Sequence, residues 1–132
     1  MDASKTLRLL AVDDDASSAE LIVRVAERCG YEAFATSDSR GVVALTKALS
    51  PDILAVDINM PNVDAAGLFT LLAEAGVTAR IPIVSGEDET VLQATRLRAE
   101  GLGLAVPYVL QKPLDFQKLR AMLMAPMVRT AA

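Results

Sequence analysis

Acidic side chains follow two short apolar runs of the sequence. Asp13, Asp14 and Asp15 come directly after LRLLAV, and Asp57 comes directly after ILAV. Carboxylates gathered where strands end indicate a bound cation and chemistry on phosphate groups. Lys112, in the segment LQKP, supplies the opposite charge that such a site needs.

Carboxylates brought together without a partner repel one another, and a hard divalent cation relieves that repulsion. Mg²⁺ prefers oxygen ligands and usually combines one or two carboxylates with waters and phosphate oxygens. Lys112 can pair with the carboxylates at rest and with a phosphoryl oxygen later, while the Ser85 hydroxyl can donate to another oxygen. A carboxylate held between such groups can itself attack a phosphoryl donor, and Asp57 is the acid best placed to do so.

The apolar residues alternate between short continuous runs and helical spacing, which predicts alternating strands and helices. The predicted strands cover residues 7–12, 31–36, 53–56, 81–84 and 105–110. The predicted helices cover residues 16–29, 38–49, 65–75, 87–100 and 115–125. This alternation predicts a doubly wound α/β domain, with a flavodoxin-like five-stranded parallel sheet. For the strand order 2-1-3-4-5, ligands bind between strands one and three, where Asp13, Asp14 and Asp57 would lie.

The composition limits the class of protein. A chain of 132 residues with 52% hydrophobic content can close one core, so we expect a single domain with a core over about residues 6–125 and a short tail at 126–132. The net charge of −4 and the scattered basic residues argue against direct nucleic-acid binding. One cysteine, and no apolar run near the roughly 18 residues of a membrane span, favour a soluble cytoplasmic protein.

The ordered motifs resemble the receiver domain of two-component response regulators, of which the chemotaxis response regulator is the minimal example. The resemblance covers nearly the whole chain. It rests on four motifs, one after each of four strands: Asp13-Asp14, Asp57-Ile-Asn-Met-Pro61, Ser85-Gly86 and Lys112-Pro113.

This resemblance implies that a histidine kinase or a phosphotransfer protein phosphorylates Asp57, and that the Lys112–Pro113 bond is cis. The site residues it implies are the phosphoacceptor Asp57, the phosphoryl contacts Ser85 and Lys112, and the Mg²⁺ ligands Asp14, Asp57 and Asn59 (by its backbone carbonyl), with Asp13 acting largely through water. Asp15 has no role in the family, and we expect it to cap the following helix.

The resemblance also implies a mode of signalling. The protein would catalyse only its own phosphoryl transfer and dephosphorylation, and would act through protein contact as a monomer or weak dimer. The contact face would be formed by residues 87–100, 105–110 and 115–125. Its candidate apolar residues, for most of which core packing is the expected role, are Tyr108, Leu114, Phe116 and Leu119.

The chain departs from the family pattern at several positions. Val109 stands three residues before the lysine, where many receivers place a switch Tyr or Phe, and strand parity puts Tyr108 on the opposite face. Pro82 removes a ladder donor and predicts a short or irregular fourth strand. The long interval from Ser85 to Lys112 predicts an extended fourth helix or a longer loop.

Two alternative functions fit part of the pattern. Asp13-x-Asp15 matches the nucleophile and acid of a small Mg²⁺-dependent phosphatase resembling the haloacid dehalogenase group, but that function gives no reason for Asp57. A degenerate receiver that serves only as a binding module is the other alternative. The complete set of acids, serine and lysine argues against it.

Overall fold

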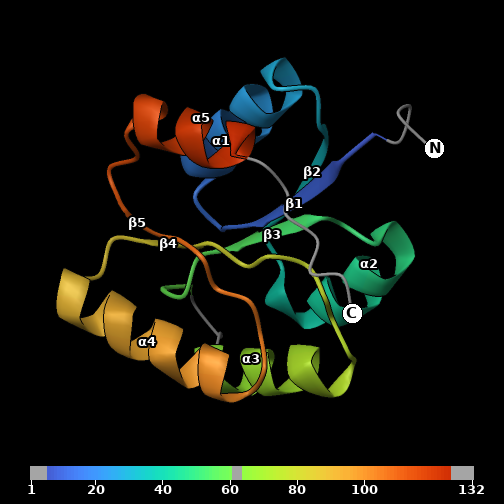
Figure 1. Ribbon diagram of the computed structural model, residues 1–132, viewed down its shortest axis with the longest axis vertical. Coiled ribbons are helices and arrows are strands. Elements are labelled where there is room, and N and C mark those ends of the chain that lie inside the picture. The colour runs from blue at the N-terminus through green and yellow to red at the C-terminus, as the bar shows by residue number, and fades with distance from the viewer. Residues whose placement is uncertain (1–5, 61–63, 126–132) are drawn as a thin grey trace.

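The computed structural model describes residues 6–60 and 64–125 and contains one five-stranded parallel sheet of order β2-β1-β3-β4-β5 (Figure 1). The strands are β1 (Arg8–Val12), β2 (Glu32–Thr36), β3 (Ile53–Val56), β4 (Ile83–Ser85) and β5 (Val109–Gln111). The helices are α1 (Ala16–Arg28), the 3₁₀-helix η1 (Ser39–Gly41), α2 (Val42–Leu49), α3 (Ala65–Glu74), α4 (Glu89–Gly101) and α5 (Phe116–Met124). The predicted fold and strand order are confirmed. Pro61 of the third motif lies outside the described residues.

Helices cover both faces of the sheet, so the central strands are buried on both sides, which explains their continuous apolar runs. Helices α1 and α5 lie on one face, and α2, α3 and α4 lie on the other (Figure 1). Leu9 and Ala11 of β1 pack into the cluster on the α1/α5 face, whereas Leu10 and Val12 pack into the cluster on the opposite face.

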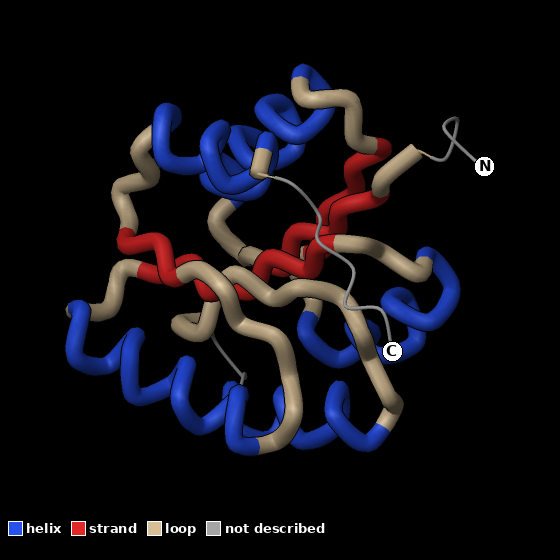
Figure 2. Tube along the Cα trace, in the orientation of Figure 1, coloured by secondary structure: helices blue, strands red, loops and turns tan. Residues whose placement is uncertain are grey.

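Aspartates begin several of the helices by accepting backbone N–H bonds that the first turn leaves free. Asp15 caps α1, Asp88 caps α4 and Asp115 caps α5. Asp38 caps η1, so the predicted helix 38–49 divides into η1 and α2. Figure 2 shows the loops that lead from the carboxyl ends of β1 and β4 into α1 and α4, the helices that Asp15 and Asp88 cap.

Pro82 shortens the fourth strand, as predicted, but the strand lies later in the chain than the sequence indicated. The predicted 81–84 is observed as Ile83–Ser85, because proline has no N–H to donate to the β3 side of the ladder, the side that its carbonyl faces. Arg80 instead forms isolated bridges with Ile53 and Ala105. The Pro82 carbonyl still accepts a bond of 3.0 Å from the Val56 N–H, so β3 and β4 remain joined.

The fifth strand is also shorter than predicted, since Ala105 belongs to an isolated bridge and the regular strand begins at Val109. Helix α4 is 13 residues long and is followed by a connecting segment, 102–108, as the long interval before Lys112 indicated. Val109 packs against the cluster on the α3/α4 face, and Tyr108 packs against the cluster on the α1/α5 face. The prediction that these two side chains lie on opposite faces of the sheet is confirmed.

The candidate contact residues are mostly part of the core, as expected. Leu119 is fully buried, and Tyr108 and Leu114 are half-buried against the α1/α5 cluster. Phe116, at the start of α5, is 44% exposed. Phe116 is therefore the member of this set that offers apolar surface.

Candidate functional site

The predicted site residues meet at the carboxyl ends of the strands. Asp13 directly follows β1, Asp57 directly follows β3, and Lys112 directly follows β5. Backbone bonds extend the ladder to the two acids: the Asp13 N–H donates to the Thr36 carbonyl at 3.0 Å, and the Asp57 N–H donates to the Val12 carbonyl at 2.9 Å. The sheet therefore fixes the backbone from which both carboxylates project.

Lys112 joins the two buried carboxylates. Its Nζ lies 2.9 Å from Oδ2 of Asp57 and 2.9 Å from Oδ2 of Asp13. The side chains of Asp13 and Asp57 are 1% and 4% exposed, and that of Lys112 is 16% exposed. Water screens these charges weakly, so the ammonium and the carboxylates depend on one another for compensation.

Protonation equilibria reflect this packing. Burial raises the pKa of Asp13 above its ordinary value, despite the opposing hydrogen bonds from Lys112 and from the Asp15 backbone. Burial also favours the neutral form of Lys112, but its bonds to Asp57 and Asp13 outweigh that cost and raise its pKa. Lys112 therefore stays a cation in the resting site.

Backbone N–H groups orient both carboxylates. The Asn59 N–H donates to Oδ1 of Asp57 at 2.8 Å, and the Asp15 N–H donates to Oδ1 of Asp13 at 2.9 Å. The other oxygen of Asp57, Oδ2, accepts a hydrogen bond of 2.9 Å from the ammonium of Lys112. On Asp13 the same ammonium donates to Oδ1, at 3.2 Å, and approaches Oδ2 as a charge contact. The Asn59 side chain is exposed beside this site.

The donor set fits a divalent cation. Asp13, Asp14 and Asp57 each offer one carboxylate oxygen, and these three atoms lie within 4.8 Å of one another. When ionised, three carboxylates beside one ammonium leave two negative charges, which one Mg²⁺ would balance. Oδ2 of Asp13 is buried and accepts no well-aligned hydrogen bond from a described residue, so it can accept one from a metal-bound water.

Asp14 is the exposed member of the three, whereas Asp13 is 2% exposed and already held by Lys112. A cation arriving from solvent therefore meets the Asp14 carboxylate more readily than that of Asp13. Direct ligation by Asp14, with Asp13 acting through water, stays a prediction.

Ser85 ends β4 and is fully buried beside the end of β5. Its carbonyl accepts a bond of 2.7 Å from the Lys112 N–H, which aligns the loops that carry the serine and the lysine. Its hydroxyl oxygen accepts a long bond of 3.4 Å from the Glu87 N–H. The hydroxyl proton is thus left to donate elsewhere. The Lys112–Pro113 bond is cis, as the resemblance implied.

The side chain of Asp15 bonds within the first turn of α1. This side chain accepts bonds from the Ser17 N–H and the Ser18 hydroxyl, each at 3.0 Å, and the bond from Ser18 lowers the pKa of this carboxyl. The predicted role as a helix cap is confirmed.

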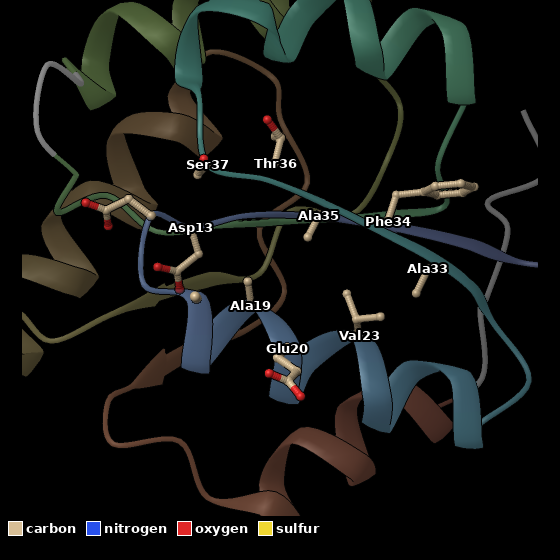
Figure 3. Close-up of a pocket in the computed structure, with 11 residues that line it drawn as sticks. Asp13, Ala19, Glu20, Val23, Ala33, Phe34, Ala35, Thr36 and Ser37 are labelled. Atoms are coloured by element: carbon tan, nitrogen blue, oxygen red, sulfur yellow. The ribbon is translucent and has the colours of Figure 1, made fainter.

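Sequence reasoning missed a groove of about 500 Å³ between α1 and β2 that opens beside Asp13 and Asp14. Figure 3 shows Ala19 and Val23 of α1 facing Ala33 and Ala35 of β2. The groove is open because small side chains stand on the edge strand, and the spacing of alanines in EAFAT was the available signal.

Residues 9–124 match the family described as the response regulator receiver domain. The chain belongs to this family. The geometry above therefore lies in a receiver domain, a class that binds Mg²⁺ at an acidic cluster and functions in two-component signalling. The comparisons give no support to the phosphatase alternative.

Curated relatives are longer than this receiver. It is 28% identical to the DNA-binding dual master transcriptional regulator RpaA of a Synechocystis species, over 93% of this chain and 50% of that protein. It is 33% identical to the positive alginate biosynthesis regulatory protein of Pseudomonas aeruginosa, over 72% of this chain and 40% of that protein. The receiver thus spans half or less of the length of these relatives.

Solved structures share the fold. A response regulator from Colwellia psychrerythraea aligns with a TM-score of 0.78 and 28% identity, covering 90% of this chain and 94% of that one. The chemotaxis response regulator CheY4 of Vibrio cholerae aligns with a TM-score of 0.74 and 21% identity, covering 90% and 97%. Within the described ranges, no helix has the length and apolar character needed to cross a bilayer.

Proposed function

We propose that Asp57 is the phosphoacceptor of this receiver and that Asp14, Asp57 and the Asn59 carbonyl bind Mg²⁺, with Asp13 acting through water. The observation that carries the proposal is the contact of Lys112 with both buried acids, at 2.9 Å each. Asp57 is the acid whose two oxygens are held by separate groups, the Asn59 N–H and the Lys112 ammonium. This carboxylate is oriented before a phosphoryl donor arrives.

In the transfer step, a carboxylate oxygen of Asp57 attacks the phosphorus atom of a phosphohistidine. A new O–P bond forms, the P–N bond breaks, and the imidazole nitrogen leaves with the electron pair. Lys112 then pairs with a phosphoryl oxygen, and the Ser85 hydroxyl donates to another. Mg²⁺, when bound, neutralises charge on the phosphoryl oxygens.

The partners follow from this chemistry. A sensor histidine kinase or a histidine phosphotransfer protein would supply the phosphoryl group, in the cytoplasm where the donor is made. Residues 6–125 would act as one receiver domain, as a monomer or a weak dimer, and would catalyse only their own phosphorylation and dephosphorylation. The downstream protein would bind over α4, β5 and α5, where Phe116 is exposed.

Incubation with acetyl phosphate and Mg²⁺, followed by mapping of the label, tests this function. The expected product is a labile acyl phosphate on Asp57 that does not form when EDTA removes the metal. Steady release of phosphate with the label on Asp13 would overturn the proposal and support a phosphatase instead.

A further inference from the structure

The side chain of Gln111 ties the end of β5 to the loop between β4 and α4. Its Nε2 donates to the Glu87 carbonyl at 3.0 Å. This loop, Gly86–Asp88, directly follows Ser85, whose hydroxyl faces the phosphoryl group in the proposed function. Gln111 therefore contacts the backbone two residues after this serine.

Strand register explains why Gln111 reaches this loop. Ser85 pairs with Gln111, and Ile83 pairs with Val109. Registered neighbours in a parallel sheet project to the same face, and residues two apart in a strand share a face. Ile83 and Val109 pack into the cluster on the α3/α4 face. Gln111 therefore projects on the α4 side, two residues nearer the site than Val109.

The loop has few other anchors. The bond from the Glu87 N–H to the Ser85 hydroxyl is long, at 3.4 Å, and Gly86 is exposed. Among the described residues, the remaining hydrogen bonds of this loop run into the first turn of α4, where Asp88 accepts from the Val91 and Leu92 N–H groups. The amide of Gln111 is thus the link between the loop and the edge of the sheet.

We propose that Gln111 is a positioning residue that holds the β4–α4 loop in its unphosphorylated arrangement and releases it when Ser85 closes on the phosphoryl group. The inference rests on the proposed role of Asp57. Val109 is aliphatic and half-buried in the core, so it has no polar group with which to contact this loop. Gln111 supplies a polar contact from the same face of β5.

The hydrogen bond of Gln111 should change the affinity for a phosphoryl group in one direction. A bond made only in the resting arrangement lowers the population of the arrangement that binds a phosphoryl group, and so lowers the apparent affinity for that group. Loss of the amide should therefore tighten binding. A neutral and solvent-accessible hydrogen bond supports a change of about two- to fivefold.

The test uses beryllofluoride with Mg²⁺ as a stable mimic of the phosphoryl group. Gln111→Met keeps the side-chain length and removes the donor. Gln93→Met is the matched control, because the Gln93 amide also forms an exposed bond, of 3.1 Å to Glu89, but stays within α4. Binding is followed by NMR, which also reports the side-chain amide of Gln111.

We expect Gln111→Met to bind beryllofluoride about two- to fivefold more tightly than the wild type, and Gln93→Met to match the wild type. The side-chain amide resonances of Gln111 should shift when the wild-type protein is saturated. Unchanged or weaker binding by Gln111→Met, or a Gln111 amide that does not respond, would overturn the inference. Failure of the wild type itself to bind would instead overturn the phosphoacceptor role, and the inference with it.

Discussion

The ammonium of Lys112 and the carboxylate of Asp57, 55 residues apart in the sequence, form an ion pair of 2.9 Å that is largely closed to water. The same ammonium lies 2.9 Å from Asp13. One cation therefore compensates two buried carboxylates before any metal or phosphoryl group arrives. Removing the ammonium or one of the carboxylates should therefore change the stability of the folded protein.

Replacing Lys112 with Met should destabilise the metal-free protein by about 3 kcal/mol, because two buried carboxylates then lack their cation. Mg²⁺ should restore more stability to this variant than to the wild type. Urea unfolding with and without Mg²⁺ measures both effects. Lys118→Met, at an exposed position of α5, is the control. An equal response to Mg²⁺ in Lys112→Met and wild type would contradict the shared site.

Asp13→Asn should stabilise the metal-free protein at neutral pH, since the raised pKa of Asp13 means that folding disfavours its ionised form. A carboxyl with a raised folded-state pKa contributes stability that is fully present below the unfolded value of 3.8 and is lost as pH rises through the folded value. The advantage of the variant should therefore grow as pH rises through that range. Urea midpoints across the acid range give the answer, and an advantage that shrinks with rising pH would refute it.

Asp15→Ala should lower the thermal unfolding midpoint through loss of the α1 cap. Phosphorylation by acetyl phosphate should stay within about twofold of wild type, a small barrier change. Thermal unfolding and initial labelling rates measure the two effects. A variant of normal stability that cannot be labelled would place Asp15 in the chemistry, as the phosphatase alternative requires.

Asn59 and Glu87 should tune the lifetime of the phosphoryl group, because they stand two residues after Asp57 and Ser85 and can orient an attacking water. Substituting either with Ala should change the rate of autodephosphorylation by more than about twofold. Loss of label after removal of the donor gives this rate. Rates within about twofold of the wild type for both variants would contradict a role of these side chains in dephosphorylation.

The sequence predicted the elements that carry the site because buried parallel strands leave long apolar runs and because acids follow them directly. The strand Ile53–Val56 and the cap at Asp15 are found where they were predicted. The fourth and fifth strands were misplaced, since Pro82 lacks a ladder donor and Ala105 pairs with Arg80 through an isolated bridge.

The bond between Gln111 and Glu87 was not predictable from sequence, because an exposed glutamine in a strand carries no signal of its partner. That contact depends on the register between β4 and β5. The register in turn depends on which side chains are buried on each face of the sheet. The placement of Val109 and Tyr108 on opposite faces was predictable, because successive side chains in a strand point to opposite faces of the sheet.

Phosphate stoichiometry after incubation with acetyl phosphate and Mg²⁺ tests the central proposal most directly, in wild type, Asp57→Asn and Asp38→Asn. Asp38 caps η1 on the surface and serves as the control acid. The account predicts labelling of wild type and Asp38→Asn to the same extent, and no label on Asp57→Asn. Labelling of Asp57→Asn at the wild-type rate would contradict it.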